Sequence, residues 1–226
     1  MANIAAVKGI LTRIYGERGG ELALQRIMPL IERFSAKKRE KEGYFSEKDV
    51  VLITYGDSLK RAGEAPLATL HDFANTYLKN AISTIHFLPF FPYSSDDGFS
   101  VMDFHAINPE LGSWEDVVAI GGDFQLMFDY VVNHFSSQGE WFENYLAGKE
   151  GFKDFAIEVD PSTDLSQVTR PRSLPLLSEY KKQDGSTVHL WTTFSADQID
   201  FNFKSLDVLE KMIEVLLFYV QQGATI

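Results

Sequence analysis

Short β-branched runs alternate with helix-like segments from Val50 onward, and this alternation constrains the fold more than any other feature of the sequence. Three runs have the strand pattern: residues 50–55, 84–87 and 124–132. The first is continuously apolar or β-branched, as expected of a strand buried on both faces. Three segments repeat apolar residues at helical spacing: residues 66–79, 114–120 and 205–220. The alternation predicts an α/β fold with a parallel sheet and right-handed crossovers.

Long connections after the second and third runs indicate which parallel-sheet fold this is. They are residues 89–112 and 133–204, and each follows the C-terminal end of a strand, where a (β/α)8 (TIM) barrel builds its active site. The longer one exceeds an ordinary loop and predicts an inserted domain. A doubly wound sheet is the alternative, but Tyr55-Gly56-Asp57-Ser58 is not a glycine-rich phosphate turn. We therefore expect a barrel domain at 50–132 and 205–226, interrupted by an inserted domain at 133–204.

Residues 1–49 differ in character and predict a helical arm in front of this fold. One apolar stripe includes Leu11, Ile14 and Tyr15; a second includes Leu22, Leu24, Ile27, Ile31 and Phe34. Gly19-Gly20 is expected to break the helix between them, and Pro29 to kink the second part. The charged run at 37–42 is interpreted as a solvated helix end.

Helix signals and the last residues suggest that the barrel is incomplete. Ser113 is predicted to cap the 114–120 helix, with Asp116 in its first turn, and Gly223 to end the 205–220 helix. Ala224-Thr225-Ile226 resembles the start of a fourth strand. Because a barrel of this type needs eight strands, we expect a partial barrel, about the first three strand-helix units.

Composition restricts the partners. The formal net charge is −11 at pH 7, with a pI of about 4.9, which disfavours nucleic acid and anionic membranes. There is no cysteine, so disulfides and thiolate metal sites are excluded. The first 20 residues lack a signal-peptide pattern, and no segment reaches the roughly 18 apolar residues of a membrane span. We expect a cytoplasmic protein; the sequence does not indicate its oligomeric state.

Three clusters could carry chemistry, and each has a structural alternative. Asp129 lies in an apolar run that ends in Asn133-His134, either as a core carboxylate with a loop histidine or as polar groups facing a pocket. Asp96-Asp97-Gly98-Phe99 is either a sugar subsite or a plain turn. Phe194 begins a third cluster, at residues 194–202, which supplies a platform aromatic or only anchors the inserted segment.

Taken in order, the motifs TYGD, SSDDGFSVMDFHAINPELGSW, DYVVNH, RPR and QIDFN resemble the α-amylase superfamily of retaining glycosidases and transglycosidases. Within it the chain is most similar to the sucrose phosphorylase group, over about residues 50–226. The N-terminal arm resembles the extension of the glucosylglycerate phosphorylases, which favours that subgroup. The alternatives are an amylase-type hydrolase or transglucosidase, or a non-catalytic carbohydrate-binding piece.

The resemblance implies a double displacement on an α-glucoside, with inorganic phosphate as co-substrate, α-glucose 1-phosphate as product and neither cofactor nor metal. It implies that Asp96 and His134 hydrogen-bond glucose and that Phe99 and Phe194 cover its apolar faces. The other substrate-binding positions that it implies are Gln198 near the scissile bond, Tyr55 and Asp57 at the first strand's mouth, and Arg172, with Arg170, on the acceptor or phosphate side. Asp129 and Asn133 are implied to be structural residues. The family's nucleophile and acid/base carboxylates are expected beyond Ile226, so no residue here is predicted to be catalytic.

Overall fold

The computed structural model describes residues 4–33, 46–169 and 172–226, which form two compact units. The first unit contains helix α1 (Ile4–Arg33) and residues 132–217; the second contains residues 46–131 and 218–226. Helix α5 (Leu206–Gln221) begins in the first unit and ends in the second. The domain boundaries at 49, 132 and 204 remain predictions.

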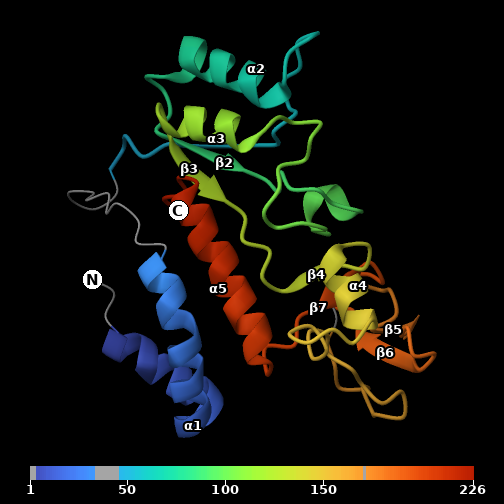
Figure 1. The fold of residues 1–226 in the computed structure, drawn as a ribbon. Helices are drawn as coiled ribbons and strands as arrows, with labels where there is room; N and C mark the ends of the chain where they lie inside the picture. Colours follow the sequence, from blue (N-terminus) through green and yellow to red (C-terminus); the bar gives the residue numbers. More distant parts are fainter. Residues whose placement is uncertain (1–3, 34–45, 170–171) are drawn as a thin grey trace. The chain divides into compact units, whose positions relative to one another are not determined.

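Helix α1 folds back on itself at Gly16, which has a φ of 74° and is the non-helical residue inside the helix (Figure 1). The predicted break at Gly19-Gly20 is therefore wrong, because both glycines lie within the helix. A Cβ at Gly20 would lie 2.6 Å from the backbone of Thr12, so this glycine allows the two halves of the helix to approach closely. The backbone keeps helical angles at Pro29, where a kink was predicted.

The arm packs on α5 through a small apolar core. Leu11, Ala23 and Ile27 are buried in it, and α5 contributes Leu206, Leu209 and Ile213. Ile14 and Leu22 were predicted to lie on the apolar stripes, but the fold-back at Gly16 leaves them 64% and 50% exposed. Phe34 and the charged run at 37–42 lie outside the described residues.

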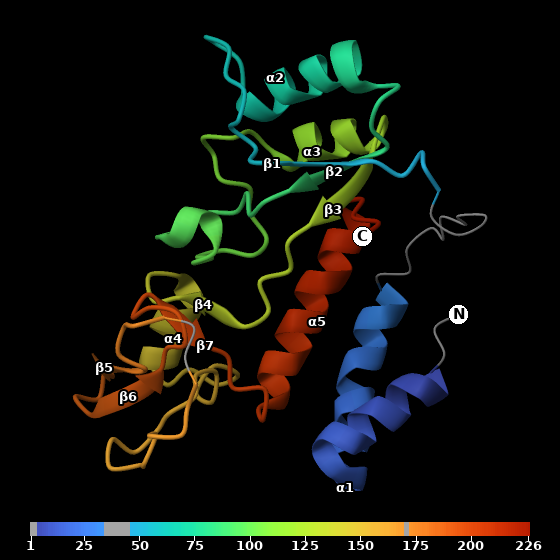
Figure 2. The same cartoon turned by 180° about the vertical axis from the view of Figure 1, so that it is seen from behind.

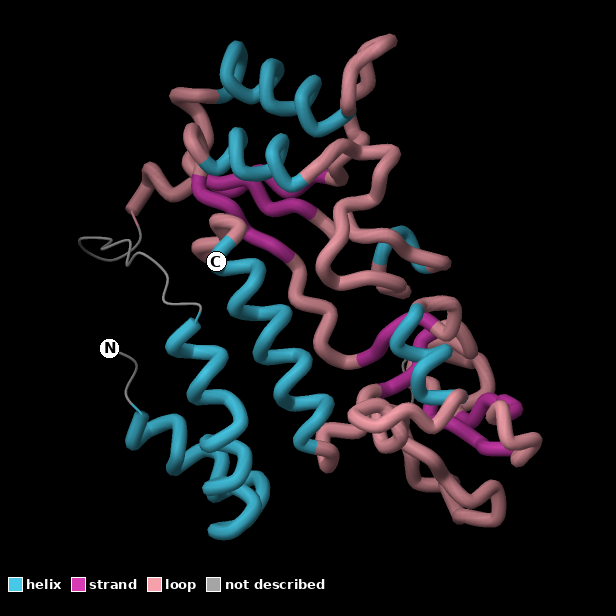
Figure 3. The backbone as a smooth tube through the Cα atoms, viewed as in Figure 1, coloured by secondary structure: helices cyan, strands magenta, loops and turns pink. Residues whose placement is uncertain are grey.

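The second unit is built on a parallel three-stranded sheet in the order β1-β2-β3 (Figure 2). The strands are β1 (Val51–Thr54), β2 (Thr84–Phe87) and β3 (Gln125–Phe128). Helices α2 (Pro66–Phe73) and α3 (Trp114–Gly121) cover one face, and a π-helical turn (Ala74–Leu78) extends α2 (Figure 3). This is the strand-helix repeat expected of a partial barrel.

The two faces of the sheet differ sharply. The strand side chains that face the helices are buried: Ile85, Phe87, Leu126 and Phe128. The helices contribute the buried residues Leu67 and Leu70 from α2 and Val117 and Ile120 from α3. On the other face Val51 and Ile53 remain 44% and 61% exposed. The prediction that the first strand is buried on both faces is therefore wrong. In the described chain β1 is an edge strand, and alternate side chains of an edge strand can face solvent.

Two other predicted elements need correction in detail. The third run was expected to be a strand as far as Val132, but β3 ends at Phe128 and the chain leaves the sheet at Asp129. Phe73 and Tyr77 were placed on an apolar side, yet they are 36% and 71% exposed. Their rings lie 5.1 Å apart on the outer surface.

The predicted helix signals and the fourth-strand stub are confirmed. The backbone N–H of Ser113 donates to the Asp116 carboxylate over 2.8 Å, which closes a capping box on α3. Gly223 ends α5 with a φ of 106°. Ala224 then forms a parallel bridge with Leu126 of β3, as the first residue of a neighbouring strand would.

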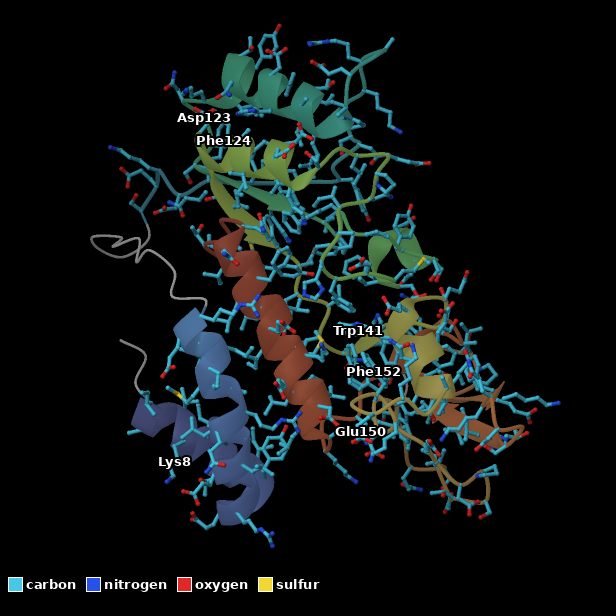
Figure 4. All side chains as sticks on the ribbon, viewed as in Figure 1. Lys8, Asp123, Phe124, Trp141, Glu150 and Phe152 are labelled. Atoms are coloured by element: carbon cyan, nitrogen blue, oxygen red, sulfur yellow. The ribbon has the colours of Figure 1, made fainter. Side chains whose placement is uncertain are left out.

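The inserted segment has secondary structure of its own, as predicted. Two two-stranded antiparallel sheets and a helix make it up: β4 (His134–Ser136) with β7 (Gln198–Asp200), β5 (Leu177–Lys181) with β6 (Thr187–Trp191), and α4 (Glu140–Leu146). Aromatic rings hold it together: Trp141, labelled in Figure 4, is edge-on to Phe155 at 5.6 Å, and Phe135 is stacked on Phe201 at 4.7 Å. The β4–β7 pairing brings the two ends of the segment together.

Candidate functional site

The Asp96–Phe99 turn has an unusual backbone. Asp96, Asp97 and Gly98 have φ values of 57°, 50° and 104°, so three successive residues are left-handed. The N–H of Phe99 donates to the carbonyl of Asp96 over 3.0 Å and closes the turn. Left-handed non-glycine residues are uncommon, cost of order 1–3 kcal/mol each and cluster at ligand-binding sites. The turn holds two adjacent carboxylates, both exposed, on a fixed backbone.

Gly98 has no space for a side chain. A Cβ there would lie 2.7 Å from the carbonyl oxygen of Pro89, at the start of the segment that leaves β2. Beside the turn, Tyr93 and Val101 form an antiparallel bridge. The Tyr93–Val101 bridge therefore holds the two ends of the turn together, and the close approach of Gly98 to Pro89 fixes its middle.

Tyr55 and Asp57 follow β1 and line a pocket of about 310 Å³ in the second unit. The residues around the pocket are Tyr55, Gly56, Asp57, Pro89, Tyr93, Asp97, Asn108, Glu110 and Leu111. Asp57 also forms an ion pair of 3.1 Å with Lys60. The sequence placed Tyr55 and Asp57 at the first strand's mouth, where the structure has them.

His134 begins β4 in the first unit and is 95% buried, with 5% of its surface exposed. Its Nε2 lies 3.1 Å from Nε2 of Gln198, whose Oε1 accepts from the Ser195 hydroxyl over 2.9 Å. The amide nitrogen of Gln198 therefore faces Nε2 of His134, and Nδ2 of Asn133 lies 3.4 Å from Nδ1 of the same ring. The ring of Phe194 stands edge-on to the imidazole at 5.1 Å. Three predicted substrate-binding residues are thus brought together.

Asp200 of β7, opposite His134 in the ladder, is a buried carboxylate that we did not predict as a site residue. It accepts from the N–H of Thr193 over 2.9 Å and from its hydroxyl over 2.5 Å. Burial raises the pKa of Asp200, although the bonds from Thr193 favour its charged form. An aspartate between the apolar Ile199 and Phe201 was the sequence signal that could have identified it.

Asp129 lies just past the end of β3, and its Oδ2 is 3.3 Å from Nε2 of His86 on β2. Both atoms are buried, and neither makes a hydrogen bond of good geometry within the described chain. The parallel register places His86 opposite Met127, on the open face of the sheet. We did not predict His86, although a histidine inside an apolar strand is a signal for such a pair.

The predicted site residues fall into two sets. Tyr55, Asp57, Asp96, Phe99 and Asp129 belong to the second unit; Asn133, His134, Arg172, Phe194 and Gln198 belong to the first. Asn133 is exposed and its carbonyl accepts from the N–H of Phe201 over 3.0 Å. Arg172 lies exposed in a connecting segment, and Arg170 lies outside the described residues.

Comparison with known proteins identifies the family. Residues 75–225 match the model of the α-amylase catalytic domain. The chain belongs to the α-amylase catalytic-domain family. This confirms the family indicated by DYVVNH and QIDFN.

Curated relatives of this α-amylase-family chain are phosphorylases. The glucosylglycerate phosphorylase of Escherichia coli K12 is 48% identical over 95% of the chain and 38% of its own length. The Spirochaeta thermophila enzyme of the same name is 46% identical over 100% of the chain and 40% of its own length. The sucrose phosphorylase of Streptococcus mutans is 32% identical over 74% of the chain. The chain therefore spans about two fifths of the length of the glucosylglycerate phosphorylases it matches.

Solved structures confirm the fold class. The sucrose 6F-phosphate phosphorylase of Thermoanaerobacter thermosaccharolyticum matches 80% of the chain and 39% of its own, with a TM-score of 0.72 and 29% identity. The isomaltulose synthase SmuA of Protaminobacter rubrum matches with a TM-score of 0.64 at 19% identity, a likeness of fold alone. The α-amylase-family chain is thus part of a (β/α)8 barrel.

The described residues of the α-amylase-family chain contain neither a membrane-spanning helix nor a metal-ligand cluster. None of its described helices is both long and apolar enough to span a bilayer. No three His, Asp or Glu side chains among the described residues come together in a way that could hold a metal ion.

Proposed function

We propose that the intact protein carrying this chain is a retaining α-glucoside phosphorylase of the glucosylglycerate type, which releases α-glucose 1-phosphate. The observation that carries the proposal is the 48% identity to a glucosylglycerate phosphorylase, because it extends over 95% of the chain and so includes the N-terminal arm. Sucrose phosphorylase, at 32% identity, matches only 74% of the chain. The substrate preference is therefore proposed to follow the first relative.

The local geometry supports a glucose-binding role for the predicted residues. The left-handed turn presents the Asp96 carboxylate, which can accept hydrogen bonds from two neighbouring hydroxyls. In the first unit His134 is fixed by Gln198, with Phe194 beside it as an apolar wall. Phe99 and Phe194 are proposed to cover the C–H faces of the sugar, as aromatic rings commonly do.

The chemistry proposed for the intact protein is a double displacement with two carboxylates. A nucleophile forms a β-glucosyl-enzyme, an acid/base residue protonates the leaving group, and phosphate then attacks the anomeric carbon with overall retention. No carboxylate of this chain is assigned to either role. Asp96 and Asp129 are proposed to bind substrate and to support structure, respectively, and the chain by itself is expected to be inactive.

Phosphate dependence of the intact protein tests the reaction class. With glucosylglycerate and inorganic phosphate we expect α-glucose 1-phosphate and glycerate in equal amounts, measured by enzyme-coupled assay and by NMR of the anomeric proton. Glucosylglycerate cleavage that proceeds equally fast without phosphate would instead favour an amylase-type hydrolase. A β-anomeric product would contradict retention.

An anionic acceptor such as glycerate requires a cation near the leaving-group side, and we propose Arg172 for it, since a guanidinium binds a carboxylate through a planar fork. Arg172→Ala should raise the KM for glycerate in the reverse reaction several-fold more than the KM for glycerol. Equal effects on both acceptors would remove Arg172 from this role. Lys153→Ala, an exposed cation in the same unit, is the matched control.

The remaining expectations stay predictions: a cytoplasmic location, phosphate as the co-substrate, and neither cofactor nor metal. Activity that survives dialysis against a chelator and needs only glucoside and phosphate would support the last two.

A further inference from the structure

The pocket beside the Asp96–Phe99 turn carries an inference of its own. Its walls come from the segment after β1, the turn after β2 and the segment before α3, all in the second unit. Asp97 lines it, whereas neither Asp96 nor Phe99 does. The two adjacent carboxylates of the turn therefore differ in surroundings, and Asp97 is not needed to explain the proposed glucose contacts.

Aromatic rings, hydroxyls and carboxylates around this pocket are available to bind a ligand. Tyr55 and Tyr93 are large rings that remain 37% and 45% exposed. Within the described part of the chain, neither their hydroxyls nor the carboxylates of Asp97 and Glu110 hydrogen-bond to another residue. Pro89 and Leu111 supply apolar wall. Exposed aromatic rings beside several acceptors are the groups that bind a ring with polar edges and an apolar face.

The same lining excludes other ligand classes. An anion is disfavoured, because Asp57, Asp97 and Glu110 surround the pocket and none of the described lining residues is a lysine or arginine. A metal ion is disfavoured because, among the described residues, no three acidic or histidine side chains lie close enough together to hold one. At about 310 Å³ the pocket is at the small end of ligand sites, roughly 300–1,000 Å³. A single neutral sugar ring fits both the chemistry and the size.

We propose that this pocket is a second sugar-binding site, which holds a neutral hexose ring against Tyr55 and Tyr93 with its hydroxyls donating to Asp97 and Glu110. The inference rests on the proposed function only in that its ligand is a sugar. It adds Tyr93, Asp97 and Glu110 as sugar-binding residues, distinct from Asp96 and Phe99, and it shares Tyr55 and Asp57 with the substrate-binding positions that the family resemblance implies.

The test measures binding of D-glucose to the intact protein that carries Asp96→Asn. This change weakens the hydrogen bonds to glucose that we propose for Asp96. Ligand-observed NMR titration should still show saturable binding. Adding Tyr93→Ala or Glu110→Gln should weaken it about tenfold, as expected for loss of a ring platform or a charged acceptor. Tyr93→Phe should fall between, because it keeps the ring and loses the hydroxyl.

Matched controls are Tyr77→Ala and Glu115→Gln, which remove an exposed ring and an exposed carboxylate elsewhere in the same unit and should leave binding unchanged. Thermal melts show whether each variant is folded. Glucose binding that vanishes with Asp96→Asn alone, or that ignores Tyr93 and Glu110, overturns the proposal. Phosphorolysis is measured in parallel on the unmodified protein: its absence would refute the proposed function and leave a Tyr93-dependent glucose site standing.

Discussion

Single glycines decide whether the Asp96–Phe99 turn can form. Gly98 combines a φ of 104° with a Cβ position only 2.7 Å from the carbonyl oxygen of Pro89. Gly63 has a φ of 78° but open space around its Cβ position. The two glycines therefore separate the cost of a left-handed conformation from the cost of a steric clash.

We predict that Gly98→Ala lowers the free energy of unfolding by more than the roughly 1–3 kcal/mol expected for left-handed strain, since Pro89 must also move. Gly63→Ala should show only the strain. Urea denaturation of both variants measures the difference. Equal losses would mean that the contact with Pro89 is relieved without cost. Glucose affinity should fall in Gly98→Ala and stay unchanged in Gly63→Ala.

Asp123, just before β3, is surrounded by donors from α2 and the turn that follows it (Figure 4). Its carboxylate accepts from Asn75, His71 and Lys79 at 2.9–3.0 Å. Hydrogen bonds from Asn75 first, then from His71 and Lys79, lower the pKa of Asp123 far below its ordinary value. A carboxyl whose pKa falls on folding stabilises the fold above its unfolded pKa, about 3.9, and loses that contribution as the pH falls.

Asp123→Asn should therefore lower Tm at pH 7, with the deficit shrinking as the pH drops below about 4. Glu115→Gln, which removes an exposed carboxylate of α3, should leave Tm unchanged across the range. Calorimetry from pH 7 to the acid limit of solubility tests this. A deficit that is independent of pH would show that the asparagine acts through packing and not through charge.

At the scale of elements, α1 packs on α5 through an apolar core and through a branched ion pair. Arg26 donates from Nε to Glu210 over 2.6 Å and also bonds Asp207 through Nη2. The Tyr15 hydroxyl donates to the carbonyl of Phe203 over 2.8 Å, close to the start of α5. These polar contacts orient the arm along the helix, while the apolar core supplies most of the binding energy.

Arg26→Gln should destabilise the first unit by about 1 kcal/mol, because the pair is forked but its side chains are about one-third exposed. Hydrogen exchange should rise in α1 and in the first turns of α5. Lys8→Gln breaks an exposed pair of 3.9 Å with Glu21 and serves as the neutral comparison. An unchanged exchange pattern in Arg26→Gln would leave the arm held by its apolar core alone.

The elements also show what a sequence can and cannot predict. The Ser113–Asp116 box and the Gly223 stop are local rules, and both were predicted correctly. The fold-back at Gly16 was missed because packing between the two halves of the helix, and not local propensity, determines which glycine leaves the helical conformation. At the candidate site, the Asp-Asp-Gly pattern predicted a turn, which the structure has, while its sugar-binding role stays a prediction. The approach of His86 to Asp129 was not predicted, since it depends on the register of two strands.

At the scale of the whole molecule, the open face of the sheet governs behaviour in solution. Val51 and Ile53 are exposed on β1, which has a strand partner on one side only within the described chain. An exposed apolar edge strand is a site of self-association. We predict that the isolated chain self-associates at micromolar concentration and that Ile53→Lys reduces this association without lowering Tm.

Sedimentation velocity of the isolated chain with and without Ile53→Lys tests the prediction. Val118→Lys, at a 50% exposed residue on the outer surface of α3, is the control and should not change the association. A monomeric unmodified chain with a single cooperative melt would contradict the prediction.

The left-handed turn also limits how this protein can change by mutation. Positions 96, 97 and 98 accept few residues at such φ values: glycine readily, asparagine and aspartate with modest strain, and branched side chains hardly at all. Random substitution there will mostly lower stability and not alter selectivity. A library meant to vary the proposed sugar preference should therefore keep glycine at position 98, hold positions 96 and 97 to aspartate, asparagine and glycine, and diversify Tyr93 and Glu110, whose backbones carry no such constraint.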